Sequence, residues 1–189
     1  MTKYLIVLSL LFTLFTCSAG AQQSAGPVVG KVNSRTPLRQ ENDESGKKTG
    51  SLVMRMGDAK AGKGDLVCLP VEATGFTDLI GLQFTMRFDS SALAYKSIRG
   101  TSLPGYGPQN FGVRFADRGV VSTLWTAMDL QGKTKPDNYK MFEICFTNLQ
   151  EPGEETEVRF SDGPTAFEVV REDMGELRFV YANGVVKSK

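Results

Sequence analysis

The chain of 189 residues contains no histidine. This absence excludes a Ser-His-Asp triad, a Cys-His catalytic pair and any histidine-ligated metal site built from the chain's own residues. Beyond the N-terminal segment, no apolar run reaches the ~18 residues that a membrane-spanning helix needs. The cysteines do not form a Cys-x-x-Cys redox motif. These absences favour a binding protein over an enzyme.

The first 21 residues have the parts of a secretion signal. Lys3 supplies the positive start, an apolar run follows it, and the small residues Ala19 to Ala21 offer a cleavage site. We therefore expect residues 1–21 to be removed and the chain to be secreted or held in the periplasm or at the cell surface, without a transmembrane anchor. The alternative is a lipoprotein signal that lipidates Cys17, although the threonine before it is a poor residue at that position.

The charges of the exported chain are balanced. Lys3 is the one charged residue of the first 21, so removing it from 22 basic and 21 acidic residues leaves 21 of each. Nucleic acids and anionic membranes attract an excess of basic charge gathered on one face. No basic cluster stands out in the sequence, so we expect no nucleic-acid or membrane partner.

Residues 22–50 differ in composition from the rest of the chain. The stretch 33–48 has almost no apolar residues and several turn formers, so it cannot bury enough surface to offset its ordering entropy. We expect a flexible polar linker over 22–50 and one domain over 51–189. A partner-binding tail is the functional alternative for the linker.

From residue 51 onward the pattern predicts an all-β domain. Leu82, Phe84 and Met86 share one parity and polar residues take the other, which is typical of a strand buried on one face. Short apolar runs separated by turn formers continue to the C-terminus. We expect two packed sheets, with helix confined to a turn or two and strands near residues 52–56, 65–73, 79–88, 93–98, 111–117, 119–127, 139–149, 156–161, 165–170 and 177–187.

Several residues occur in the order found in cohesin domains. The order runs through Gly64-Asp65, a strand of the form Gly81-x-x-Phe84-x-x-x-Phe88-Asp89, Trp125 and the strand Phe142 to Phe146, and it ends at Asn183-Gly184-Val185-Val186. Residues 51 to 187 therefore resemble a cohesin, in particular the single cohesin-like modules of secreted bacterial proteins. The resemblance implies a β-sandwich of jelly-roll topology that binds a dockerin module of another protein and is related in architecture to carbohydrate-binding modules.

Two cysteines, Cys68 and Cys145, remain after the signal is removed. Each lies between two apolar residues of the opposite parity, so we expect both side chains on the outward side of their strands. In a cohesin-like arrangement the two strands are neighbours, and a cross-strand disulfide is then feasible in an oxidising compartment. Two unpaired thiols are the alternative.

Three aromatic features invite a ligand or a core interpretation. Trp125 could stack on a sugar ring, but its shared parity with Val121 favours the core. Tyr106 is the more exposed candidate, because its Pro- and Gly-rich surroundings form a loop. Alternation over residues 111–115 predicts that Phe111, Val113 and Phe115 form a buried face.

The acidic residues carry no catalytic or metal motif. Loops over residues 58–65 and 162–163 could hold a structural calcium ion, but their spacing is not diagnostic, and we expect no cofactor or metal. Nothing in the sequence brings two carboxylates to a common cleft, so no catalytic residue is assigned and we expect no enzyme. The carboxylates considered as a glycosidase acid and base are Glu143, Glu151, Glu154, Glu155, Glu168, Glu172 and Asp173.

The cohesin resemblance also implies where a partner binds. In cohesins the partner docks on the sheet whose strands correspond here to residues 79–88, 111–117 and 119–127. Their outward positions give a mixed surface with one apolar centre and arginines, which suits a protein partner better than a sugar. We expect protein–protein recognition; binding of a polysaccharide is the alternative, and a purely structural role is a third. The expected partner-binding residues are Gln83, Thr85, Arg87, Arg114, Ser122 and Leu124.

Overall fold

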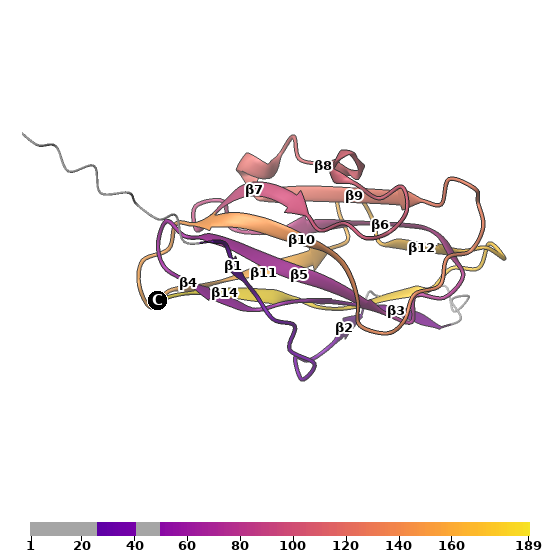
Figure 1. The fold of residues 1–189 in the computed structure, drawn as a ribbon, viewed down its shortest axis with the longest axis horizontal. Helices are drawn as coiled ribbons and strands as arrows, with labels where there is room; N and C mark the ends of the chain where they lie inside the picture. Colours follow the sequence, from indigo (N-terminus) through magenta and orange to yellow (C-terminus); the bar gives the residue numbers. More distant parts are fainter. Residues whose placement is uncertain (1–25, 41–49) are drawn as a thin grey trace, which may run out of the picture.

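The computed structural model describes residues 26–40 and 50–189. Their strands form two mixed sheets of seven strands each, packed as a sandwich (Figure 1). Helical structure in these residues is limited to two 3₁₀ turns, η1 (Pro108–Asn110) and η2 (Ala116–Arg118), drawn as short coils near β8. The expected all-β, two-sheet class is confirmed.

The strands divide between the sheets as follows. The first sheet has the order β2-β13-β3-β5-β10-β7 with β1 beside β5, and the second has the order β4-β14-β11-β6-β9-β8 with β12 beside β6. The first comprises β1 (Val28–Val29), β2 (Arg39–Gln40), β3 (Ser51–Met56), β5 (Leu66–Thr74), β7 (Leu93–Arg99), β10 (Tyr139–Asn148) and β13 (Arg178–Ala182). The second comprises β4 (Ala59–Ala61), β6 (Leu79–Arg87), β8 (Phe111–Gly112), β9 (Val120–Thr126), β11 (Glu155–Ser161), β12 (Glu168–Arg171) and β14 (Gly184–Ser188).

The core lies where the inward side chains of the two sheets meet. On β6, Leu82, Phe84 and Met86 are at most 2% exposed, as their alternation predicts. The ring of Phe84 lies 6.5 Å from that of Phe142 on β10 and 5.4 Å from that of Phe179 on β13, both in the first sheet. Close aromatic pairs of this kind join the two layers.

The C-terminal segment, expected as one strand over 177–187, is two strands in different sheets. β13 lies in the first sheet and β14 in the second, and Asn183 is the one residue between them. The Asn183 side chain accepts a hydrogen bond from the Phe160 amide at 3.0 Å and donates one to Glu157 at 2.9 Å. A Cβ at Gly184 would lie 2.5 Å from the carbonyl oxygen of Gly57, so only glycine fits this corner.

The strand expected over 111–117 ends after two residues, as β8. Phe111 is buried as expected, but Val113 and Phe115 are 41% and 45% exposed, so the predicted buried face is wrong beyond it. The chain turns into η2 and leaves it at Gly119, whose φ is 73°. A Cβ there would lie 2.0 Å from the carbonyl oxygen of Phe88, so this turn requires glycine. The strand ends earlier than predicted because the chain already turns at Val113, whose carbonyl accepts a hydrogen bond from the Ala116 amide at 3.1 Å.

The domain limits of the sequence analysis stay predictions, because residues 1–25 and 41–49 lie outside the described residues. Two short strands fall inside the segment expected as a flexible linker: β1 pairs with β5, and β2 pairs with β13. The Gly30 amide also donates to the Cys68 carbonyl at 2.8 Å. Sheet edges offer backbone partners whatever the side chains are, so a polar composition does not prevent this pairing.

Candidate functional site

The outer surface of β6 and β9 brings most of the predicted partner-binding residues together. Gln83, Thr85 and Arg87 follow one another on β6 with the parity opposite to the core residues. On β9, Leu124 lies directly opposite Gln83 and Ser122 lies directly opposite Thr85. We call this surface of the second sheet the β6–β9 face.

A hollow of about 170 Å³ lies on the β6–β9 face at Gly81. Leu124 of β9 and Val170 of β12 are among the residues that line it, and Leu124 is 53% exposed. A Cβ at Gly81 would meet only the carbonyl oxygen of Trp125, at 3.5 Å, an ordinary contact. The fold therefore tolerates a side chain at this position although the sequence provides none. We call this space the Gly81 hollow.

Thr85 is fully buried, so the predicted exposure of its side chain on this face is wrong. The loop between β11 and β12 covers it: the Thr85 hydroxyl donates to the Thr165 carbonyl at 2.8 Å and accepts from the Thr165 amide at 2.9 Å. The loop itself is held by Asp162, which accepts a hydrogen bond from the Phe167 amide at 2.6 Å. This covering loop lies far along the chain from Thr85, so strand parity alone could not predict it.

Arg87 lies beyond the covering loop, in a second hollow of about 360 Å³. The register places Arg87 directly opposite Arg159 of β11, and Arg118 of η2 lines the same space. The Arg87 Nε donates to the Gly163 carbonyl at 3.3 Å, which fixes the guanidinium group. We call this space the arginine hollow; sequence reasoning found Arg87 but missed Arg118 and Arg159.

Arg114 lies after β8 rather than on a strand of the face. Its guanidinium carbon lies 5.6 Å from the centre of the Phe115 ring, and that of Arg118 lies 5.5 Å from the same ring. Both distances are within the range of a cation–π interaction. Phe115 is 45% exposed, so this edge of the sheet presents an aromatic ring flanked by two arginines.

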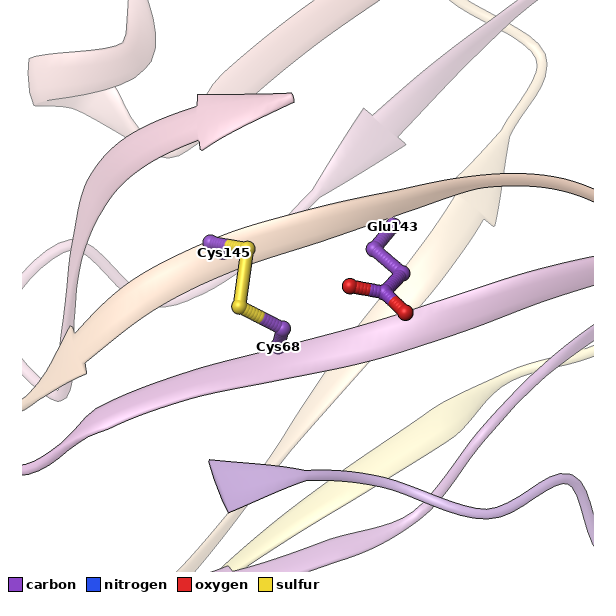
Figure 2. Close-up of side chains that lie close together, drawn as sticks. All are labelled: Cys68, Glu143 and Cys145. Atoms are coloured by element: carbon purple, nitrogen blue, oxygen red, sulfur yellow. A yellow bond between two sulfur atoms is a disulfide. The ribbon is translucent and has the colours of Figure 1, made fainter. Parts of the chain in front are cut away.

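A disulfide joins β5 and β10 on the outer side of the first sheet (Figure 2). Cys68 of β5 and Cys145 of β10 lie directly opposite each other, with a Cα–Cα distance of 4.0 Å, and their sulfur atoms are bonded. The predicted pairing is confirmed. Neither cysteine belongs to the inner core cluster, as their parity predicts, yet both are fully buried.

Glu143 of β10 lies beside the disulfide, with its carboxylate turned toward β5 (Figure 2). The three side chains place potential metal ligands within 4.8 Å of one another. The two sulfur atoms are bonded to each other, and only a thiolate binds metal strongly, so the oxidised protein has no metal site here. Glu143 is instead paired with two cations, Arg99 (Nε to Oε2, 2.6 Å) and Lys140.

The electrostatics of Glu143 argue against a catalytic acid. Burial acts to raise the pKa of its carboxyl group, but the hydrogen bonds and charges of Lys140 and Arg99 outweigh burial and lower the pKa overall. A carboxylate with a lowered pKa stays ionised at neutral pH and does not donate a proton. Glu143 is therefore a structural charge. Glu168, another of the seven candidate carboxylates, lies in the opposite sheet at the Gly81 hollow.

The two aromatic ligand candidates are both buried. Trp125 is fully buried, as its parity predicts, and its indole N–H donates to the Pro104 carbonyl at 2.9 Å. Tyr106 is 3% exposed, so its predicted exposure is wrong. Its loop folds the ring inward against Phe142, and its hydroxyl bonds to the Thr123 hydroxyl at 2.8 Å.

The carboxylates of the acidic loops accept hydrogen bonds from backbone amides. Asp58 accepts from the Val185 amide at 2.8 Å, and Asp65 accepts from the Gly62 amide at 2.7 Å. Asp162 holds the covering loop in the same way. These contacts give the acidic residues a structural role in turns.

Comparison with known proteins identifies the fold. No family model matches the chain, and no curated protein matches its sequence. Among solved structures, the chain is similar to a type I cohesin–dockerin complex from Clostridium thermocellum, with a TM-score of 0.62 and 15% identity over 74% of this chain and 100% of that chain. It is also similar to the third cohesin of ScaC from Acetivibrio cellulolyticus, in complex with the ScaB dockerin (TM-score 0.59, 18% identity, 72% of this chain and 98% of that chain).

A third similar structure is a non-cellulosomal cohesin from the archaeon Archaeoglobus fulgidus, with a TM-score of 0.54 and 13% identity over 74% of this chain and 92% of that chain. Sequence identity is low in all three comparisons, so the likeness concerns the fold. The chain has the cohesin fold, as the resemblance in its sequence implies.

Proposed function

We propose that this chain is a non-catalytic module that recognises a protein partner of the dockerin type through the β6–β9 face. The observation that carries the proposal is the Gly81 hollow with Leu124 exposed on its rim. A large apolar side chain at a hollow surrounded by polar groups is typical of the centre of a protein–protein interface. The hollow is sized for about one partner side chain.

The solved structures support the kind of partner. Two of the similar cohesin structures are complexes with dockerins. The β6–β9 face has the strands on which the sequence resemblance places the partner, and its two hollows leave room for projecting side chains. A dockerin-like protein is therefore the partner that we propose.

Carbohydrate binding has less support than protein binding. Sugar platforms use exposed aromatic planes, and the single tryptophan of the chain, Trp125, is fully buried. Phe115 is exposed, but its ring is flanked by Arg114 and Arg118 rather than by a second aromatic platform. The β6–β9 face lacks the flat aromatic surface that the alternative requires.

Export is part of the proposal. The predicted signal over residues 1–21 lies outside the described residues, while the disulfide fits an oxidising compartment. Among residues 26–40 and 50–189, no helix has the length and apolar character needed to cross a membrane. We propose that the module acts outside the cytoplasm.

The test asks whether filling the Gly81 hollow lowers the affinity for a protein partner. The exported chain would be immobilised and used to capture proteins from the culture medium of its source, and each captured protein would be purified and titrated. Gly81→Leu should fill the hollow without unfolding the protein, and Leu124→Asp should remove its apolar rim. We expect each variant to weaken a true partner at least tenfold, which is about 1.4 kcal/mol at a hot spot.

The matched control is Leu66→Asp, which makes the same change at a 37% exposed leucine of β5 in the first sheet. It should leave the affinity within about twofold. Equal affinity of all three variants and the wild type would contradict the proposed face. If the immobilised chain retains a glycan and no protein, the result would favour carbohydrate binding over protein binding.

A further inference from the structure

The arginine hollow contains a like-charged pair on neighbouring strands. Arg87 and Arg159 are directly opposite each other on adjacent antiparallel strands. Like charges in this position are destabilising, because cross-strand Cβ atoms lie only about 5 Å apart. A surface pair of like charges that costs stability and that no carboxylate offsets is a candidate for binding.

A third arginine completes the cluster. Arg118 lines the same hollow from η2, and its guanidinium group rests over the Phe115 ring at 5.5 Å. Arg87 is fixed through Nε on the Gly163 carbonyl, which leaves its two terminal nitrogens available. Two of the three guanidinium groups are therefore positioned before any ligand arrives.

The two carboxylates that line the hollow have other hydrogen-bond partners and form no ion pair with these arginines. Asp89 accepts from the Ser91 amide at 2.8 Å and from its hydroxyl at 2.6 Å. Glu157 pairs with Arg39 at 3.2 Å and accepts from Asn183. In the described part of the chain, none of the three arginines forms an ion pair with a carboxylate.

We propose that the arginine hollow binds the carboxylates of an acidic segment on the protein partner. Guanidinium groups bind carboxylates through paired N–H donors, which gives both charge and directional recognition. The inference rests on the proposed function, because it assigns part of the same face. It adds the chemistry of the partner, namely at least two aspartate or glutamate side chains close together.

The position of the two hollows favours a polypeptide as the occupant. Gly81 and Arg87 are six residues apart on one strand, which is about 20 Å at ~3.3 Å per residue. The covering loop at Thr165 lies between them on Thr85. A partner that fills both spaces presents an apolar side chain and an acidic group about 20 Å apart, as a protein surface can.

The test measures binding of a peptide of six glutamates with blocked ends to the exported chain at low ionic strength. The variant Arg118→Gln/Arg159→Gln removes two charges from the hollow. The control Arg35→Gln/Lys96→Gln removes two exposed charges elsewhere. We expect saturable binding to the wild type, at least tenfold weaker binding to the hollow variant, and less than twofold change in the control.

Equal weakening in both double variants would show that only overall charge matters and would overturn the proposal, as would the absence of saturable binding. Tighter binding of a sulfated oligosaccharide than of the peptide would overturn the carboxylate assignment. The melting temperature of each variant checks folding, and Arg159→Gln should not lower it. Gly81→Leu should leave hexaglutamate binding intact, so failure of this inference is distinguishable from failure of the proposed function.

Discussion

The outer surfaces of the two sheets are both formed by the outward-facing side chains of alternating strands. They differ in whether those side chains have partners within the protein. On the first sheet, Cys68 is bonded to Cys145, and the buried carboxylate of Glu143 has two cationic partners. On the second sheet, Leu124 is exposed and Arg159 faces another arginine. The cysteines and the carboxylate of the first surface have partners within the protein, whereas the side chains of Leu124 and Arg159 on the second surface have none among the described residues, so the two surfaces should respond differently to mutation.

The largest expected effect is removal of the disulfide. Cys68→Ala/Cys145→Ala opens a link between residues separated by 77 positions, and the chain-entropy account predicts a loss of about 4 kcal/mol in the free energy of unfolding. Urea denaturation measures it. Partner affinity on the β6–β9 face should stay unchanged where the variant is folded. A loss below about 1 kcal/mol would mean that the first surface is not held by its cross-link.

The next effect concerns the buried carboxylate of the first surface. Glu143→Gln leaves Arg99 and Lys140 without their anion, and we expect a loss of about 1–3 kcal/mol at pH 7. Because the folded state lowers the pKa of Glu143, its stabilisation is present above the unfolded value near 4.5 and is lost as the pH falls below it. The difference between wild type and variant should therefore shrink below that pH.

The matched control for Glu143→Gln is Glu151→Gln, at an exposed pair with Lys63. Exposed pairs of this kind contribute at most about 1 kcal/mol. Denaturation curves between pH 3 and 7 distinguish the two positions. A difference for Glu143→Gln that grows toward low pH would contradict the sign of the pKa shift.

A smaller effect compares two polar residues that face each other on the β6–β9 face. Thr85→Ala removes both hydrogen bonds to Thr165 and should cost about 1–2 kcal/mol in unfolding free energy. Ser122→Ala, directly opposite, should change stability by less than about 0.5 kcal/mol. Thermal denaturation measures both. Equal losses would mean that the loop does not depend on Thr85.

The sequence predicts the parts of this molecule that depend on local alternation. The burial of Leu82, Phe84 and Met86 on β6, the core position of Trp125 and the outward parity of both cysteines follow from a period of two along each strand. The cysteine pairing required the cohesin resemblance as well, because it depends on which strands are neighbours.

The sequence predictions are wrong or incomplete where segments far apart in the chain come into contact. Thr85 is covered by a loop some eighty positions later in the chain, and Tyr106 is drawn inward by a contact with Phe142 of the other sheet. Arg159 reaches the candidate site only through the register of β11 with β6. These placements depend on long-range pairing, which a local pattern does not contain.

The smallest expected effect separates paired from unpaired arginines. Arg99→Gln breaks the contact with Glu143 and should cost about 1 kcal/mol, because a buried carboxylate loses a donor. Arg159→Gln removes a like-charged neighbour and should leave stability unchanged or raise it by a few tenths of a kcal/mol. Melting temperatures of both variants provide the comparison. A clear loss for Arg159→Gln would assign Arg159 a structural role.

The most direct test of the central claim is amide hydrogen exchange of the exported chain with and without a partner captured as described above. The account predicts that binding slows exchange in β6, β9 and the covering loop between β11 and β12, while β5 and β10 around the disulfide exchange as in the unbound protein. Protection confined to β5, β10 and β7 would contradict it, because the partner would then bind the first sheet, on the surface that carries the disulfide.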